Sequence, residues 1–239
     1  MTFSRYLFLL LLFPGIAVWG MDEKENVDPW EPFNRKVFAF NETLDKHVLL
    51  PTARGYRFVI PDPAEQGVSN FIANIYEFNT VFNALLQGRP LIALSSGGRF
   101  LVNTTVGLFG LIDVASPMGI ERNDTDFDQT LAVWGVESGP YLVLPVLGPN
   151  TVRSTAGYAV DANLSIPSLY MDNDEAWVFR AVEAIDIRAR LIKSDDLVTG
   201  DRYIFIRNAY LQRSAYFLNE GSVEDTFSNP EEEDYYEEF

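Results

Sequence analysis

The stretch that decides the fold runs from Arg99 to Asp113 and reads Arg-Phe-Leu-Val-Asn-Thr-Thr-Val-Gly-Leu-Phe-Gly-Leu-Ile-Asp. It is mostly apolar and has almost no charge, whereas the surface helix of a water-soluble protein carries a charged outer face. A helix that spans a bilayer needs about 20 unbroken apolar residues, and Gly107 and Gly110 interrupt this one. The stretch therefore predicts short helical pieces beside an apolar medium, with its small polar residues turned inward.

The composition of the whole chain leaves two readings open for its apolar residues. Apolar side chains make up 47% of the 239 residues and aromatic ones 14%, which suits a sizeable core or a lipid-facing surface. The net charge is -16, and residues 219–239 hold nine acidic side chains and no Lys or Arg. Residues 220–239 are therefore expected to form an acidic, disordered tail. The remaining body is still acidic, which argues against nucleic-acid binding.

The rarest residue types limit the chemistry. The sequence has no cysteine, so it contains no disulfide, thiolate metal site, cysteine nucleophile or cysteine-linked lipid. His47 is the single histidine, and a catalytic triad or histidine metal site would have to use it. Residues 123–128 resemble a calcium loop superficially, but the central glycine and the closing glutamate are missing. Neither a metal nor another cofactor is expected.

The first residues resemble a secretory signal. Arg5 precedes an apolar run from Tyr6 to Phe13, Pro14-Gly15 follows, and small residues then offer cleavage after Ala17 or Gly20. We assign residues 1–20 to this signal and 21–27 to a charged leader. The alternative is an uncleaved membrane anchor. Either reading exports the body of the chain, in which no second transmembrane helix is expected.

Helical spacing dominates the body of the chain. Apolar stripes predict helices over 33–44, ending near Pro51, and over 64–87. Capping residues, end charges and glycine or proline stops predict further helices over 91–106, 174–193 and 201–220. Residues 141–147 predict a buried loop or a short strand, and no strand alternation or long repeat occurs. Asn79 falls within an apolar arc and Asn83 at its edge, which indicates either interhelical hydrogen bonds or a wet interior surface.

Ordered phrases along the chain resemble the MlaA/VacJ family, an outer-membrane component of a phospholipid-trafficking system. They are Asp28-Pro-Trp-Glu-Pro-Phe-Asn-Arg35, Phe40-Asn41 with Leu44-Asp45, Asn70-Phe71 with Asn74, Leu85-Leu-Gln-Gly88, Arg99-Phe100 with Asn103-Thr-Thr105, Gly110 with Asp113, Gln129-Thr-Leu131, Trp134-Gly135, Gly139-Pro-Tyr141, and Leu144-Pro145 with Gly148-Pro149.

The resemblance implies an all-α protein over residues 28–219, a single ring-shaped domain of amphipathic and short interfacial helices with a central channel and little or no sheet. It implies a place in the inner leaflet of the outer membrane, on the periplasmic side. Such proteins remove mislocalised phospholipid from the outer leaflet, pass it to a soluble periplasmic lipid carrier and associate with a trimeric porin. No covalent chemistry is attributed to the family, so the chain is not expected to be an enzyme.

Two sets of candidate residues follow. A lipid headgroup needs a hydrated path, and uncharged side chains would solvate it without trapping it. We expect this path to be lined by Asn34, Asn41, Asn79, Asn83, Asn103, Thr104 and Thr105. The last two helices also carry a set of arginines that either pair with local acids or form a docking face for an acidic partner or lipid headgroups. They are Arg180, Arg188, Arg190, Arg202, Arg207 and Arg213.

The chain departs from the family pattern in two places, and two other functions stay open. Family members usually end the signal with a cysteine, which this chain lacks, and Asp128 stands where a glycine is common. One alternative function is a secreted phospholipid hydrolase that uses carboxylates such as Asp113 and Asp128. Against it stand the single histidine and the absence of a Gly-x-Ser-x-Gly elbow. The other alternative is a porin-associated structural protein without a transport role.

Overall fold

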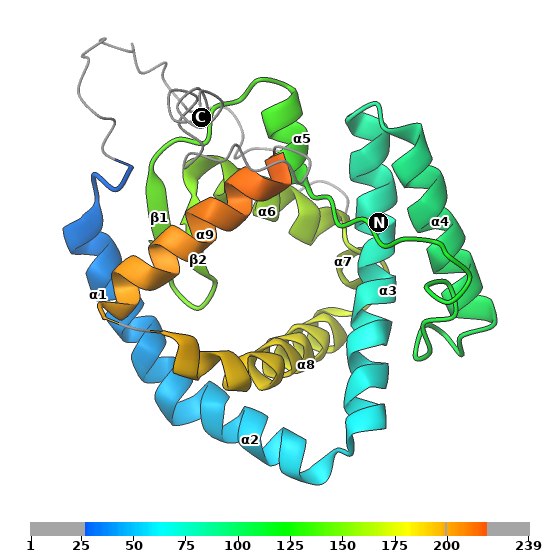
Figure 1. Ribbon diagram of the computed structural model, residues 1–239, viewed down its shortest axis with the longest axis horizontal. Coiled ribbons are helices and arrows are strands. Elements are labelled where there is room, and N and C mark those ends of the chain that lie inside the picture. Colours follow the sequence, from blue (N-terminus) through cyan, green and yellow to red (C-terminus); the bar gives the residue numbers. More distant parts are fainter. Residues whose placement is uncertain (1–26, 199, 219–239) are drawn as a thin grey trace, which may run out of the picture.

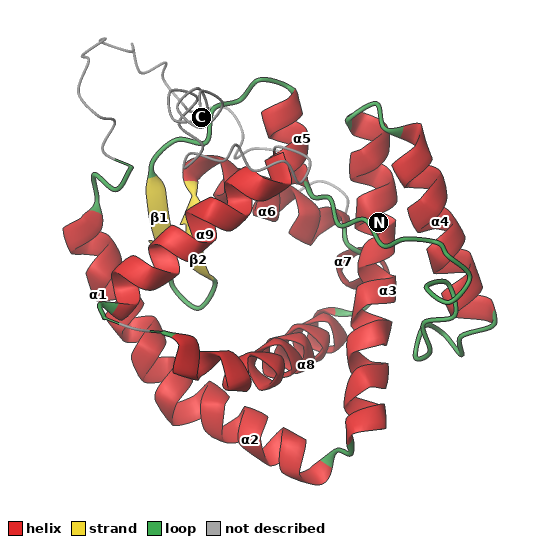
Figure 2. Ribbon diagram, in the orientation of Figure 1, coloured by secondary structure: helices red, strands yellow, loops and turns green. Residues whose placement is uncertain are grey.

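The computed structural model describes residues 27–198 and 200–218. The predicted signal at 1–20, the leader up to residue 26 and the tail at 220–239 lie outside these residues. The described chain is all-α, with one small two-stranded sheet (Figure 2). Its helices are arranged as a ring around a central opening (Figure 1).

One nearly continuous helical segment forms the first side of the ring. Helix α1 (Glu31–Leu44) passes into a π-helical turn (Asp45–Leu49) and then into α2 (Leu50–Val59). The predicted end near Pro51 is therefore wrong. Proline has no N–H to give and its ring crowds the preceding turn of an α-helix. Here Pro51 lies at the start of α2, directly after the wider π turn, and the helix continues through it.

Helices α3 (Asp62–Leu86) and α4 (Pro90–Thr105) form a hairpin with polar residues on the inside. Gly88, at φ +70°, makes the turn between them. On α4, Ser96, Arg99 and Asn103 are at most 4% exposed, whereas Leu91, Leu94 and Leu101 are 81%, 73% and 63% exposed. This is the reverse of a water-soluble helix. Of the small polar residues in the stretch from Arg99 to Asp113, Asn103 turns inward as predicted and Thr104 is half-buried, but the prediction is wrong for Thr105, which is exposed.

The segment after residue 126 carries the small sheet. Helix α5 (Phe127–Val133) precedes β1 (Tyr141–Leu144), which pairs antiparallel with β2 (Gly148–Thr151) in the register Tyr141 to Thr151. The strand reading of this segment is thus the correct one. Helices α6 (Val152–Leu164) and α7 (Ile166–Tyr170) follow. Tyr141 and Val143 of β1 form the buried core with Tyr203.

Two helices complete the ring. Helix α8 (Asn173–Leu191) packs along α2, and α9 (Arg202–Leu218) crosses β2 after a 3₁₀ segment (Ile192–Leu197) (Figure 1). The capping side chain of α8 is Asp172, whose carboxylate accepts from the backbone of Glu175 in a capping box. None of the helices within the described residues combines the length and the apolar character that crossing a bilayer requires.

Candidate functional site

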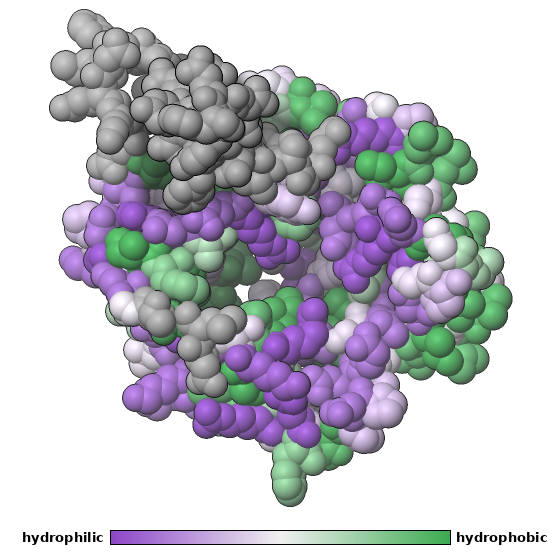
Figure 3. All heavy atoms as spheres, viewed as in Figure 1, coloured by the Kyte–Doolittle hydropathy of each residue, from purple (hydrophilic) through white to green (hydrophobic). Residues whose placement is uncertain are grey.

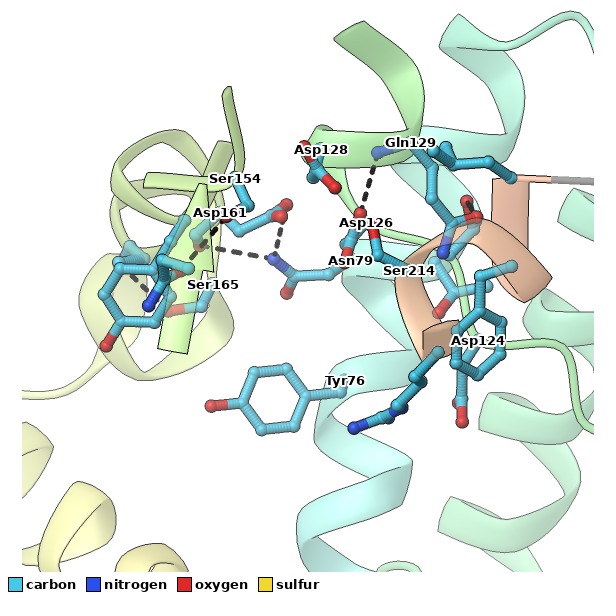
Figure 4. Close-up of a pocket in the computed structure, with 18 of the residues that line it drawn as sticks. Tyr76, Asn79, Asp124, Asp126, Asp128, Gln129, Ser154, Asp161, Ser165 and Ser214 are labelled. Atoms are coloured by element: carbon cyan, nitrogen blue, oxygen red, sulfur yellow. Dashed lines mark hydrogen bonds between the residues drawn. The ribbon is translucent and has the colours of Figure 1, made fainter. Parts of the chain in front are cut away.

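A cavity of about 530 Å³ lies between α3, α5, α6, α8 and α9. Most of its lining residues have polar side chains, and they include carboxylates, arginines and tyrosines from elements far apart in the sequence. Figure 4 shows Asn79 of α3 pointing toward Asp161 of α6, with Asp126 nearby and Ser214 of α9 across from them. The cavity is thus a junction at which side chains from several sides of the ring meet.

Asp161 is the shared hydrogen-bond acceptor in the wall between α3 and α6. Asn83 donates from Nδ2 to Asp161 Oδ1 at 2.9 Å, and Asn79 donates to the same carboxylate and to the Asp161 carbonyl. The backbone N–H of Phe127 donates to Asp161 Oδ2 at 2.8 Å. Burial raises the pKa of Asp161, and these hydrogen bonds oppose the rise without cancelling it. The carboxylate thus fixes α3, α5 and α6 together while it lines the cavity.

A second wall is formed by α3 and α8. Tyr76 donates from its hydroxyl to Glu183 Oε2 at 2.9 Å. Arg180, one turn before Glu183, donates to the Tyr158 hydroxyl at 3.4 Å and to the Ala162 carbonyl at 3.2 Å. Burial raises the pKa of Glu183, against the hydrogen bond from Tyr76 and the positive charge of Arg180. This wall therefore places a carboxylate, a guanidinium and two phenols around one side of the cavity.

The third wall lies at the N-terminus of α5. Asp126 caps this helix by accepting from the backbone N–H of Gln129 at 2.9 Å. Desolvation within the crowded wall raises the pKa of Asp126 to about 6, and the charges of Asp128 and Asp161 add to the effect. Asp128 itself forms an ion pair with Arg153 at 2.7 Å, and Tyr210 of α9 donates to Ser154 at 2.8 Å.

The predicted lipid-path residues are spread over the molecule, and Asn79 is the one that lines this cavity. Asn83 is fully buried just behind it and accepts from the Thr130 hydroxyl. Asn34 and Asn41 fasten α1 to the β1 segment: Asn34 accepts from the backbone N–H of Val143 and Asn41 from that of Val146. Interhelical and helix-to-strand hydrogen bonds thus account for these amides.

The remaining predicted path residues lie on α4. Asn103 accepts from the backbone N–H groups of Val114 and Ala115 and so holds the loop that follows α4. Thr104 accepts from Asn74 Nδ2 at 2.9 Å, which joins α4 to α3. Thr105 is exposed and donates to the Leu101 carbonyl. These three residues are placed on the outer hairpin of the ring.

Most of the predicted arginines are held in ion pairs. Four of its members are paired with acids that mostly come from other elements: Arg188 with Asp45 and Asp195, Arg190 with Asp186, Arg202 with Glu42 and Asp195, and Arg207 with Asp28 and Glu31. Arg180 and Arg213 instead line the cavity, and Arg213 lies over the ring of Phe217.

The carboxylates considered for hydrolysis are held in ion pairs. Asp113 bonds Arg99 at 3.0 Å, and although burial raises its pKa, the hydrogen bonds from Ser116, Arg99 and Asn103 lower the pKa to about 2. Asp128 is tied to Arg153. His47 is exposed, and its Nδ1 lies 2.8 Å from the Thr43 carbonyl oxygen. These positions suit structural roles better than general acid–base chemistry.

The sequence analysis predicted Arg180 and Arg213 but missed the unpaired acids of the cavity, Asp126, Asp161 and Glu183, and the tyrosines beside them, Tyr76, Tyr158 and Tyr210. Asp161 would have been the easiest of them to predict, since it is an isolated acid in the apolar segment Ala159-Val-Asp-Ala162. The other residues come from separate helices, and their convergence depends on how α3, α8 and α9 are arranged. The expectation of an uncharged lining does not describe this cavity.

The outer surface has the opposite character. Figure 3 shows apolar residues gathered on the side of the molecule where α4 lies. Leu108 and Phe109, which follow α4, are 59% and 74% exposed and adopt positive φ angles of 52° and 60°. Phe58 at the end of α2 is 92% exposed. Large apolar side chains on this scale are costly in water and indicate a different surrounding.

The chain is similar to a family of bacterial transport proteins. A family model described as MlaA lipoprotein matches residues 26–217. The Escherichia coli (strain K12) protein "Intermembrane phospholipid transport system lipoprotein MlaA" is 36% identical over 220 residues, covering 89% of this chain and 86% of that protein. The Haemophilus influenzae protein of the same name is 35% identical over 205 residues, covering 83% and 82%.

A solved structure is also similar over most of its length. It was determined in work on the structural basis for maintenance of bacterial outer membrane lipid asymmetry. The two structures agree with a TM-score of 0.72 at 38% sequence identity, covering 80% of this chain and 98% of the other.

Proposed function

The chain belongs to the MlaA lipoprotein family, and we propose that it is an outer-membrane component of intermembrane phospholipid transport. In this role it removes mislocalised phospholipid from the outer leaflet through the ring and so maintains lipid asymmetry. A phospholipid has an apolar tail and a charged head, so a protein that moves it must offer a place for each. The polar cavity supports a path for the head, and the apolar exterior supports contact with the tails.

The single observation that carries this proposal is the inverted amphipathicity of the α3–α4 hairpin. Arg99 donates from Nε to Glu77 Oε1 at 2.8 Å, with the two side chains 3% and 4% exposed, while the leucines of α4 face outward. Burying each such leucine in an apolar medium is worth about 1.5–3 kcal/mol. The hairpin is therefore more stable against lipid than against water.

The finer parts of the proposal concern location and partners. We place the ring on the periplasmic side, in the inner leaflet, with a trimeric porin beside it and a soluble periplasmic carrier that receives the lipid. We also propose that the chain catalyses no reaction, and that its attachment does not depend on a cysteine-linked lipid. Of the predicted path residues, we assign Asn79 to the headgroup path because it lines the cavity.

The test is complementation of an Escherichia coli strain that lacks its own MlaA. Expression of this chain should lower the amount of phospholipid that an added phospholipase can reach at the cell surface. Ser214→Trp should abolish this effect because Ser214 lines the cavity and the indole would obstruct it. Gln212→Trp, on an exposed position of the same helix, is the matched control and should complement.

Two outcomes would contradict the proposal. Complementation by Ser214→Trp at the parent's level would exclude this cavity from the path. Failure of the parent chain, despite its presence in the outer membrane, would exclude a transport role in that host. Incubation of the purified protein with phospholipid separates transport from hydrolysis, since a transport protein leaves the lipid masses unchanged.

A further inference from the structure

The cavity holds charges of both signs that have no ion-pair partner. Within residues 27–198 and 200–218, Asp126, Asp161 and Glu183 form no ion pair with a basic side chain, and Arg180 and Arg213 form none with an acidic one. The other charged lining residues are paired, Arg122 with Asp124 and Asp128 with Arg153. Exposed or half-buried charges of both signs therefore face one cavity without an ion pair in the described part of the chain.

The unpaired carboxylates do not gather into a metal site. In the described part of the chain, no three acidic or histidine side chains are arranged to hold a metal ion. Asp161 belongs to α6, Asp126 to the start of α5 and Glu183 to α8, so the negative charge surrounds the cavity instead of converging on a point. Such a distribution suits a bulky organic cation better than a compact ion.

Neutral groups in the same walls suit an amine as well. Asn79 is 6% exposed, and its Oδ1 has no hydrogen-bond partner among the described residues. Tyr76, Tyr158 and Tyr210 line the cavity beside the carboxylates. Carbonyl oxygens and aromatic faces both stabilise ammonium groups.

We propose that this cavity selects phospholipids whose headgroup carries an amine, with the phosphate at Arg180 and Arg213 and the ammonium among Asp126, Asp161 and Glu183. The proposal rests on the proposed transport function and adds a preference among its substrates. A zwitterionic headgroup supplies both of the missing counter-charges. A headgroup with a phosphate and a neutral alcohol satisfies the arginines but leaves three carboxylates facing an anion, which costs binding energy.

The test measures which lipids the protein takes up. Purified full-length protein is incubated with vesicles that contain equal amounts of phosphatidylethanolamine and phosphatidylglycerol, then separated from them, and its bound lipids are extracted and weighed by mass spectrometry. We expect phosphatidylethanolamine to exceed phosphatidylglycerol by about tenfold. A bound mixture that equals the vesicle composition would overturn the proposal.

Variants separate the two halves of the site. Glu183→Gln keeps the acceptor for Tyr76 but removes the charge, so the preference should fall several-fold while total bound lipid persists. Arg213→Gln should instead lower the binding of both lipids, since both carry the phosphate. Asp174→Asn and Arg54→Gln, at exposed positions outside the cavity, make the same charge changes and should alter neither quantity. Equal effects of Glu183→Gln and Asp174→Asn would overturn the assignment of the amine site.

Failure of this proposal is distinguishable from failure of the transport function. A protein that binds both lipids equally and still clears surface phospholipid transports without selecting. A protein that binds no lipid and clears none fails both. Competition with soluble phosphoethanolamine shows whether the headgroup alone is recognised: displacement of bound lipid supports the site, and no displacement at high excess places recognition on the acyl chains and overturns it.

Discussion

At the scale of single residues, buried polar side chains have two different roles in this protein. Asn34 is fully buried and donates to Asp28 Oδ1 and the Tyr141 carbonyl while it accepts from Val143, so its hydrogen-bonding capacity is used in fastening α1 to β1. Asn79 retains an unused acceptor at the cavity. Both residues were predicted to line the lipid path, and their spacing, with Asn34 on the flank of one stripe and Asn79 within another, does not show what either amide contacts.

Asp126 allows a prediction about pH at this scale. Its pKa is raised in the folded protein from 3.8 to about 6, so between these values the folded state binds more protons than the unfolded state. Stability therefore falls as the pH rises through this window. Asp126→Asn keeps the cap of α5 and removes the titration.

Compared with the parent, Asp126→Asn should be more stable at pH 7 and equally stable near pH 4. The measurement is the urea midpoint of each protein at both values of pH. Asp124→Asn, which makes the same change two residues away, serves as the control. A constant difference between variant and parent across this range would show that Asp126 does not titrate there.

At the scale of elements, the α3–α4 hairpin shows how a polar interior can hold two helices together. Arg99 bonds Glu77 at 2.8 Å and Asp113 at 3.0 Å, and it also donates to the Ser116 hydroxyl and the Ile120 carbonyl. Glu77 is 4% exposed, and burial raises its pKa despite the hydrogen bond from Arg99. The pair therefore depends on both partners being present.

Arg99→Met should destabilise the protein by about 3–5 kcal/mol because it leaves the carboxylate of Glu77 buried without a counter-charge. The double variant Arg99→Met with Glu77→Met should recover part of this loss, since the buried carboxylate of Glu77 is then absent while Asp113 still lacks its bond to Arg99. Chemical denaturation of the parent, the two single variants and the double variant gives the coupling energy. Additive losses in the double variant would mean that the two side chains act independently.

The elements also show how much of the fold can be predicted from the sequence. An apolar stripe located α3, and capping, end-charge and stop signals located α4, α8 and α9, each to within a few residues. These signals are local, so they do not depend on whether a helix faces a core or a lipid. The predicted helix end near Pro51 was wrong because a π turn precedes this proline and lets the helix continue. A π turn has no sequence signal. The cavity was not predictable in this way, since Tyr76, Asp161 and Glu183 meet only after the ring has closed.

At the scale of the whole molecule, contacts between the two ends of the described chain close the ring. Asp28 accepts from the Tyr203 hydroxyl and from Arg207 Nη1 at 3.1 Å, and it also accepts from Asn34. Arg35 lies over the ring of Tyr203 at 4.4 Å. These interactions join α1 to α9 across the sequence, and α9 in turn supplies Tyr210, Arg213 and Ser214 to the cavity. The contacts that close the ring therefore also position the residues of α9 that line the cavity.

The closed ring presents its apolar residues outward, and this leads to a prediction about attachment. The 239 residues contain no cysteine, so no side chain of this sequence can carry a thioether-linked lipid. We expect Leu91, Leu94 and Leu101, which are the most exposed apolar residues of α4, to hold the protein in its lipid layer. At about 1.5–3 kcal/mol each, their combined replacement by asparagine should weaken partitioning by about three orders of magnitude or more.

The measurement is the fraction of protein that stays with outer membranes after an alkaline carbonate wash. The triple asparagine variant should be released, whereas a control with Thr43, Thr52 and Gln212 replaced by asparagine, all at exposed polar positions, should be retained like the parent. Unchanged helical content by circular dichroism would show that release does not come from unfolding. Retention of the leucine variant at the parent's level would mean that another surface holds the ring, and the outward leucines of α4 would then need a protein neighbour to account for their exposure.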